Sequence, residues 1–328
     1  MDNFASHKGI PVAMVIDTPA LGDTIASIPT LRKISEAYDN KPVHVFTSKP
    51  FLFDNHPLVY KAEKLDKADR NKFRLYKTFS QLVGKGYDLG GQGTEFRYSN
   101  YDLRQYHAAS LGFSLTSDEM EMDLYIEKPR PLPFKNYIMI HPTHTWPTRT
   151  WDQENWQELV NRLNQNNIPV VAIGRSSSEV GFYNTQKPVM DINIELGLNL
   201  LNDPDNDPAE LRWMMNNEAA AVVTMDSGIL HIAGTTDVNI IQLGSSIHPK
   251  LRAPYRKGTQ LHKYIYIKGP CNEFCSSNMK YNVKEHGSIM GVPPQVKCLA
   301  NKPTFECHPD VDIVYSTIIK MFKNGEKV

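Results

Sequence analysis

The chain has 328 residues, of which 41% are hydrophobic and 22% charged, a composition typical of a globular protein of about two domains and not of a disordered or fibrous chain. Thirty-six basic residues balance 36 acidic ones, so no net charge attracts the protein to nucleic acid or anionic lipid, and an anionic ligand needs a local basic site. No stretch approaches the ~20 apolar residues of a membrane-spanning helix, and the N-terminus lacks a signal-peptide cleavage pattern, so we expect a cytoplasmic protein.

Short β-branched runs alternate with helical patterns along most of the chain, which predicts βαβ units with parallel sheets, the α/β class. In the first half we expect a helix over residues 23–38, where isoleucines and a leucine recur at helical spacing, and strands at residues 11–17, 42–47 and near 87–89. In the second half we expect helices at residues 153–166, 208–216 and 229–234, and strands at residues 137–140, 169–173, 221–225, 239–243 and 264–268.

A proline-rich segment separates the two halves. Residues 127–133 carry three prolines in seven residues, which neither a helix nor a central strand accommodates. We therefore predict an N-terminal domain at residues 1–130 and a C-terminal domain at residues 131–328. Ligands of open α/β sheets bind beyond the carboxyl ends of the strands, so we expect the chemistry in a cleft between the two domains.

The first candidate segment is residues 17–32, in which Gly22 and Asp23 follow an expected strand. A carboxylate at the start of a helix can face the cleft and serve as a general base. The alternative is a structural N-cap, because aspartate at that position accepts hydrogen bonds from the first N–H groups of the helix. The segment alone does not decide between the two interpretations.

Two further segments follow expected strands and carry candidate phosphate ligands. Residues 140–156 contain Thr143, Thr145 and Arg149, whose hydroxyls and planar guanidinium suit the oxygens of a diphosphate, although any polar loop contains such residues. Residues 224–234 place Asp226 and Ser227 at a strand-to-helix turn, where backbone N–H groups commonly hold phosphate. The alternative for the second segment is a capped turn with a buried structural histidine.

All four cysteines lie in a short C-terminal part of the chain, at Cys271, Cys275, Cys298 and Cys307. Four thiols grouped in a chain that shows no sign of secretion favour a tetrahedral site for zinc or iron over disulfides. The spacing matches no common zinc ribbon, so two unconnected pairs of reduced thiols are the alternative. A metal in this loop-rich segment would mainly stabilise its fold.

In combination these segments resemble the heptosyltransferase-like glycosyltransferases of family 9. The resemblance covers most of the chain and depends on Leu21-Gly-Asp-Thr, on His141-Pro-Thr with Arg149, and on Asp226-Ser-Gly-Ile-Leu-His231. It implies the GT-B fold, in which two Rossmann-like domains with parallel sheets face a central cleft. It also implies an inverting transfer of a sugar from a nucleotide-diphosphate donor to an acceptor hydroxyl, with no metal ion in the catalytic step.

The resemblance also implies roles for individual residues. Asp23 corresponds to the family's general base, and Glu210 to a glutamate that holds the donor ribose. The loop from Thr143 through Thr145 to Arg149 corresponds to a loop that binds donor phosphates. The diphosphate is implied to bind at Asp226, Ser227, Gly228 and His231.

The cysteine set is similar to that of the family branch that modifies autotransporter proteins, in which four C-terminal cysteines bind iron, although the spacings differ. Related sequences also occur in bacteriophages, some of which glycosylate hydroxymethylated DNA bases. The expected acceptor is therefore a protein, a glycan or DNA. A non-catalytic nucleotide- or sugar-binding module and a nucleotide-sugar epimerase of the same architecture are the alternative functions.

Overall fold

The computed structural model of the chain describes residues 12–16, 20–65, 102–109, 111–142, 147–174, 190–201, 203, 206–256, 258–275, 298, 300, 302 and 304–323. The chain divides into two compact units, and among these residues the first unit ends at Ile126 and the second begins at Glu127. The strand expected near residues 87–89 lies outside the described residues.

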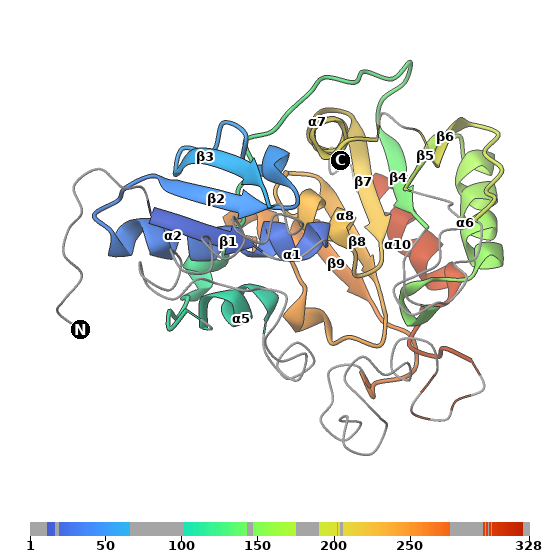
Figure 1. The fold of residues 1–328 in the computed structure, drawn as a ribbon. Coiled ribbons are helices and arrows are strands. Elements are labelled where there is room, and N and C mark those ends of the chain that lie inside the picture. The colour runs from blue at the N-terminus through green and yellow to red at the C-terminus, as the bar shows by residue number, and fades with distance from the viewer. Residues whose placement is uncertain are drawn as a thin grey trace. The chain divides into compact units, whose positions relative to one another are not determined.

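The first unit contains a parallel sheet of three strands in the order β1-β2-β3. The strands are β1 (Val12–Ile16), β2 (Val43–Thr47) and β3 (Val59–Lys64), and the helices are α1 (Leu21–Ala26), α2 (Ile28–Ala37) and α5 (Leu103–Ala109). Helix α2 packs against β1 and β2, and α5 packs against α1 and α2 (Figure 1). The two strands expected at residues 11–17 and 42–47 are confirmed as β1 and β2.

The single helix predicted over residues 23–38 is wrong, because the structure divides it into α1 and α2 at Ser27. Pro29 stands in the first turn of α2, where its missing N–H costs nothing, whereas in the interior of one long helix it would remove a hydrogen bond. The Ser27 hydroxyl donates to the Thr24 carbonyl at 2.7 Å and satisfies an acceptor at the end of α1.

The second unit contains a parallel sheet of six strands in the order β6-β5-β4-β7-β8-β9. Chain order reverses between β4 and β7, so the switch point of this sheet lies between their carboxyl ends. Every strand and helix expected between residues 137 and 268 is confirmed. The strands are β4 (Tyr137–His141), β5 (Val170–Gly174), β6 (Gly197–Leu201), β7 (Ala219–Thr224), β8 (Asn239–Leu243) and β9 (Tyr264–Ile267), and the helices are α6 (Gln153–Gln165), α7 (Pro208–Asn217), α8 (Gly228–Ala233) and α10 (Val311–Lys323).

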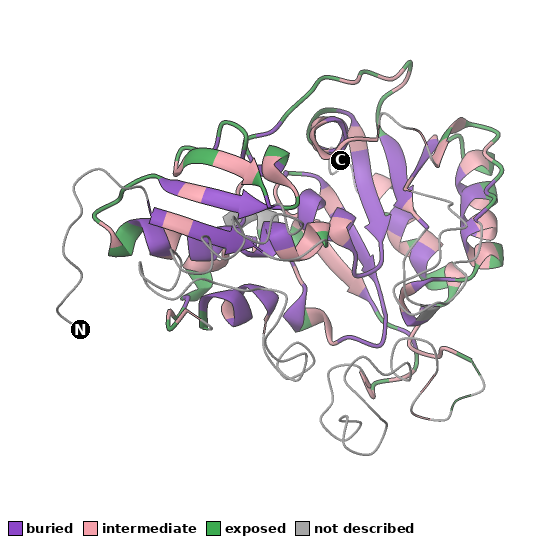
Figure 2. Ribbon diagram, in the orientation of Figure 1, coloured by how far each residue is buried: buried purple, intermediate pink, exposed green. Residues whose placement is uncertain are grey.

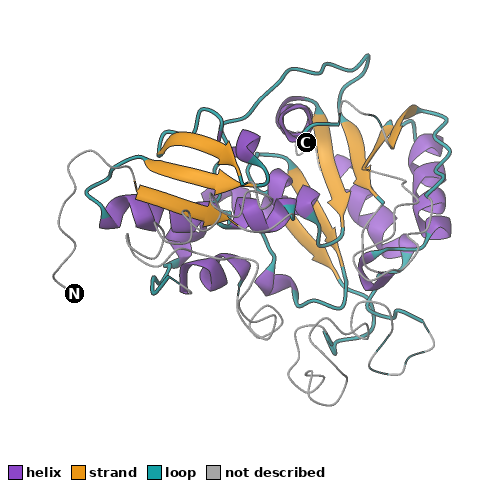
Figure 3. Ribbon diagram, in the orientation of Figure 1, coloured by secondary structure: helices purple, strands orange, loops and turns teal. Residues whose placement is uncertain are grey.

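Helices cover both faces of the six-stranded sheet (Figure 3). On one face, alternate residues of the central strands form a continuous apolar core with α6 and α10, which pack against each other. On the other face, α7 and α8 contact β7. The central strands are therefore buried from both sides (Figure 2). No helix in the described ranges combines the length and the apolar run needed to cross a bilayer.

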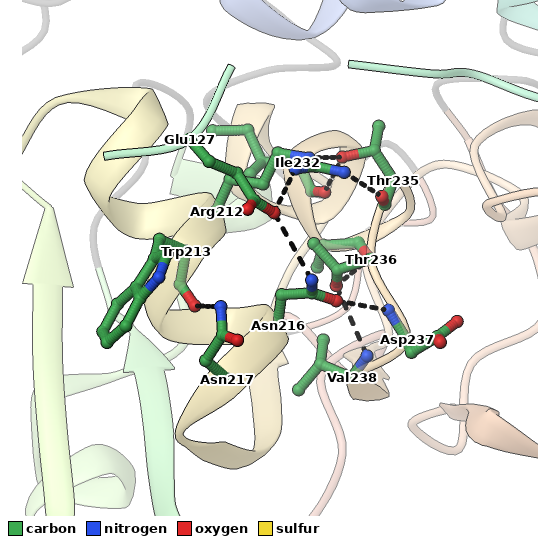
Figure 4. Close-up of polar contacts among 11 residues, drawn as sticks. Glu127, Arg212, Trp213, Asn216, Asn217, Ile232, Thr235, Thr236, Asp237 and Val238 are labelled. Carbon is green, nitrogen blue, oxygen red and sulfur yellow. Dashed lines mark hydrogen bonds and ion pairs between the residues drawn. The ribbon is translucent and has the colours of Figure 1, made fainter. Parts of the chain in front are cut away.

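The segment that follows the unit boundary makes its polar contacts with the second unit. Arg212 of α7 forms an ion pair with Glu127 and also donates to the hydroxyl and the carbonyl of Thr235, each at 3.2 Å (Figure 4). Asn216 of the same helix donates to Glu127 at 3.4 Å. Because Thr235 follows α8, one arginine ties the start of this segment to both helices on that face of the sheet.

Trp151 is central to the apolar core of the second unit, and its substitution tests how that core is stabilised. Its side chain is fully buried, its ring meets Trp156 edge-on at 5.0 Å, and its indole N–H donates to the Pro309 carbonyl at 3.0 Å. We expect Trp151→Ala to lower the free energy of unfolding by about 3–5 kcal/mol in urea denaturation. Trp213→Ala, at a half-buried site on α7, is the matched control and should cost much less. Equal losses in the two variants would contradict this account of the core.

Candidate functional site

The candidate site starts where β4 and β7 end side by side. His141 at the end of β4 pairs in register with Thr224 at the end of β7, and the imidazole Nδ1 lies 3.4 Å from the threonine hydroxyl. Burial lowers the pKa of His141 to about 4, so this imidazole is neutral at pH 7. The two segments that carry the predicted phosphate ligands therefore begin at the ends of neighbouring strands, at the switch point of the sheet.

A buried carboxylate between two arginines forms the centre of the site. Asp226 is 2% exposed, and its Oδ2 lies 3.4 Å from Nη1 of Arg149 and 3.7 Å from Nε of Arg252. Arg149 comes from the 3₁₀ turn Pro147–Arg149 after β4, and Arg252 follows the 3₁₀ turn Pro249–Leu251 after β8. Sequence analysis predicted Arg149 but not Arg252.

The charges of this group leave an excess of positive charge. Asp226, Arg149 and Arg252 carry one negative and two positive charges between them, and both guanidinium groups are largely withdrawn from water. A carboxylate repels phosphate, so Asp226 can orient the arginines but is not itself a favourable phosphate ligand. The arginine forks match phosphate oxygens, and the arrangement can accept an anion beside them.

The start of α8 adds the other residues predicted from this segment. Ser227 is the N-cap residue, but its hydroxyl makes no capping bond and instead lies 3.0 Å from the hydroxyl of Thr224. The N-cap alternative for Ser227 is therefore correct in position but not in side-chain hydrogen bonding. Gly228 is the first residue of the helix, and His231 is buried within it, 5% exposed.

Asp23 belongs to the first unit. It is half-buried and lies in the first turn of α1, whose N-cap residue is Ala20. The N-cap alternative for Asp23 is therefore wrong, and its role as a base stays a prediction. Thr143 and Thr145 lie outside the described residues.

Glu210 contacts basic residues other than Arg149 and Arg252. Its buried carboxylate forms ion pairs with Lys128 at 2.6 Å and Arg130 at 3.2 Å, both from the segment after the unit boundary. Arg130 also binds Asp203 at 2.6 Å. The side chain of Asp207 caps α7 by accepting from the Glu210 N–H at 2.9 Å. These contacts of Glu210 thus fix the proline-rich segment on α7.

The four cysteines line one pocket. Thr148 and Ser246 line the same pocket, together with Phe274 and Phe305. Burial, followed by the nearby thiols of Cys275, Cys271 and Cys298, raises the pKa of the Cys307 thiol to about 12. None of the four, all of which lie in the described part of the chain, forms a disulfide. All four thiols therefore share one neighbourhood, and both the metal site and the two pairs of reduced thiols stay predictions.

Backbone contacts hold Cys307 against the ends of two strands. A Cβ atom on Gly244, after β8, would lie 2.4 Å from the Cys307 carbonyl, and one on Gly269, after β9, would lie 2.3 Å from the carbonyls of Glu306 and His308. Only glycine permits this approach. Among the described residues, however, no three His, Cys, Asp or Glu side chains stand in a geometry that could hold a metal ion. The four thiols are of a type that binds zinc or iron, and they lie close together. Their side chains, all four of which the structure describes, do not, however, stand in the geometry of metal ligands.

Comparisons with known proteins agree with the α/β fold described above. The family model described as "Glycosyltransferase family 9 (heptosyltransferase)" matches residues 102–282. A comparison with curated protein sequences finds no match.

Three solved structures resemble the chain at low sequence identity. The iron-containing dodecameric glycosyltransferase TibC from enterotoxigenic E. coli has a TM-score of 0.66 at 16% identity, with 96% of this chain and 76% of that chain covered. The family 9 glycosyl transferase from Veillonella parvula has a TM-score of 0.61 at 13% identity, with 96% and 98% covered. ADP-heptose lipopolysaccharide heptosyltransferase II from E. coli has a TM-score of 0.57 at 16% identity, with 80% and 92% covered.

This chain folds into two α/β units with parallel sheets, and these solved structures are GT-B glycosyltransferases, so the expected GT-B fold is confirmed. The family model covers more than half of the chain and includes Arg149, Asp226 and Arg252. The chain belongs to glycosyltransferase family 9, the heptosyltransferase family.

Proposed function

We propose that the protein is an inverting glycosyltransferase that moves a sugar from a nucleotide-diphosphate donor to a hydroxyl of a macromolecular acceptor. The observation that carries this proposal is the convergence of Arg149 and Arg252 on buried Asp226 at the switch point of the second sheet. Excess positive charge at a switch point suits the diphosphate of such a donor.

The second domain, residues 131–328, binds the donor in this proposal. Arg149 and Arg252 contact the diphosphate, and Asp226 keeps their guanidinium groups oriented. The N–H groups of Ser227 and Gly228 and the imidazole of His231 add donors on the same anion, as do the hydroxyls of Thr143 and Thr145. For Glu210 to hold the donor ribose, one of its ion pairs with the proline-rich segment has to open.

The first domain, residues 1–130, binds the acceptor and supplies the base. Asp23 removes the proton of the acceptor hydroxyl while that oxygen attacks the anomeric carbon from the face opposite the diphosphate. The bond from the anomeric carbon to the diphosphate oxygen breaks, and the electron pair leaves with the nucleotide. The configuration at the anomeric carbon inverts, and no metal ion takes part in this step.

The structure of TibC in complex with ADP-D-β-D-heptose supports ADP-heptose as the first donor to test. The acceptor class stays open among a protein, a glycan and a hydroxymethylated DNA base. We also propose that the four cysteines hold zinc or iron, which the pocket they share and the iron of TibC support. The metal would cross-link the cysteine segment and stabilise its fold.

Hydrolysis of the donor separates this proposal from its alternatives. A glycosyltransferase transfers its sugar slowly to water and releases nucleoside diphosphate, whereas a binding module releases none. An epimerase converts the donor to a new nucleotide sugar without release. Release in EDTA with no added divalent ion would support a step without metal. A requirement for magnesium would instead favour a metal-dependent transferase in which Asp203 and Asp205 are the metal ligands.

The arginine pair gives the first functional prediction. We expect Arg149→Ala and Arg252→Ala each to weaken ADP binding by about 10- to 100-fold in calorimetric titration, because each removes a charge-assisted contact to phosphate. Lys250→Ala removes a positive charge from an exposed position two residues before Arg252 and is the matched control. If the control weakens binding as much as Arg252→Ala, general electrostatic attraction and not the buried pair holds the diphosphate.

Asp23 separates catalysis from donor binding. We expect Asp23→Asn to slow nucleotide release from the donor by about 10²- to 10⁴-fold, because the amide cannot accept the proton. The Kd for ADP should stay unchanged, because the proposed diphosphate ligands all lie in the other domain. Asp39→Asn, at an exposed position after α2, is the control. An Asp23→Asn enzyme with most of its activity would exclude this residue as the base.

Metal analysis tests the cysteine site. We expect purified protein to contain about one zinc or iron ion per chain. Cys271→Ser and Cys307→Ser should each lose the metal and lower the Tm, because the metal cross-links two parts of the segment. Wild-type protein without metal, or serine variants that retain it, would rule out the proposed site.

A further inference from the structure

The turn that carries Arg149 is bound on its other side by residues next to the cysteines. Thr148 is 1% exposed, and its carbonyl accepts a hydrogen bond from Nε2 of His308 at 3.1 Å. Its hydroxyl accepts one from Ser246 at 3.1 Å. Both Thr148 and Ser246 line the cysteine pocket. The residue before Arg149 is therefore part of the wall of that pocket.

His308 is fixed in turn by the chain around Cys307. The Gly269 N–H donates to the Cys307 carbonyl at 3.1 Å, and the Cys271 N–H donates to the Glu306 carbonyl at 3.0 Å. The ring of His308 also contacts Phe305, with ring centroids 5.4 Å apart. A continuous set of hydrogen bonds thus runs from the end of β9 through residues 306–308 to the Thr148 carbonyl.

This connection matters because the position of the turn sets where the side chain of Arg149 begins. Its Nη1 lies 3.4 Å from Asp226, whereas strong charge-assisted hydrogen bonds measure about 2.7–2.9 Å. A displacement of the turn displaces the backbone of Arg149 and changes this distance, so the anchoring of the turn acts on the ion pair with Asp226. His308 supplies that anchor through a backbone carbonyl one residue away.

We propose that His308 is a positioning residue for Arg149, through which the cysteine segment sets the affinity of the site for the donor diphosphate. The inference rests on the proposed function, because it assigns Arg149 to the diphosphate. It predicts that His308 acts on binding only through Arg149 and has no contact with the nucleotide.

Titration with ADP and with inorganic pyrophosphate tests the proposal. We expect His308→Ala to weaken ADP binding by about 3- to 10-fold, the effect of one lost hydrogen bond at the turn. His308→Gln should restore most of the affinity, because its amide N–H can reach the Thr148 carbonyl. His56→Ala removes a buried histidine from the first unit and should leave the Kd unchanged.

A double-mutant cycle distinguishes positioning from a general structural role. In the Arg149→Ala background we expect His308→Ala to change the Kd by less than about 2-fold, because the group it positions is gone. Equal weakening in both backgrounds, or no weakening in the wild-type background, would overturn the proposal. If His308→Ala does not fold, His308→Asn takes its place in the cycle. The asparagine side chain is one methylene shorter than that of glutamine, so its amide should not reach the Thr148 carbonyl.

Failure of the inference and failure of the proposed function give different results. If the wild-type protein binds neither ADP nor pyrophosphate, the proposed function fails, and the inference that rests on it fails as well. If the wild-type protein binds ADP and Arg149→Ala weakens binding but His308→Ala does not, the function stands and the positioning role is wrong.

Discussion

The charge of Asp226 is the constraint on which the site depends. A carboxylate that is 2% exposed is costly unless a cation accompanies it, and here two arginines do so. Arg149 follows β4, Asp226 follows β7 and Arg252 follows β8. The pairing of three parallel strands therefore brings these residues together at one edge of the sheet, although they are far apart in sequence.

The second unit holds these charges in place by contacts of its own. The register of His141 with Thr224 aligns the ends of β4 and β7, and the Thr224 hydroxyl then lies beside Ser227. The indole of Trp151 binds the Pro309 carbonyl, so the chain on both sides of Arg149 is tied to the segment after Cys307. Whatever stabilises the cysteine segment consequently acts on the turn that bears Arg149.

Much of the fold could be predicted because its signals are local. Apolar runs such as residues 170–174 read as buried strands, and the Asp-Ser-Gly turn after β7 marked the start of α8. Strand β3 was missed because three of the six residues of its sequence, VYKAEK, are charged and all six are half-buried or exposed. Strand β6 was missed because it begins with Gly197, whose φ of 137° is open to glycine and strained for other residues.

The parts of the site that could not be predicted depend on tertiary contacts. Sequence analysis did not assign Arg252 to the site, and only the fold buries it beside Asp226. Glu210 stands on the expected helix, but its ion pairs come from Lys128 and Arg130, and no local pattern indicates them. Pro29 indicated the break between α1 and α2, but the helical spacing of the apolar residues was given more weight in the prediction.

The carboxylate also explains how two arginines can be buried close to each other. Two buried guanidinium groups alone would repel each other, whereas Asp226 leaves one net positive charge, which the fold can carry. In the proposed reaction the leaving diphosphate gains about one negative charge relative to the donor, and a site already arranged for positive charge stabilises that gain most. Under the same proposal, a third cation in place of the aspartate would bind the donor more tightly but would retain the product, so the acid is consistent with turnover as well as with folding.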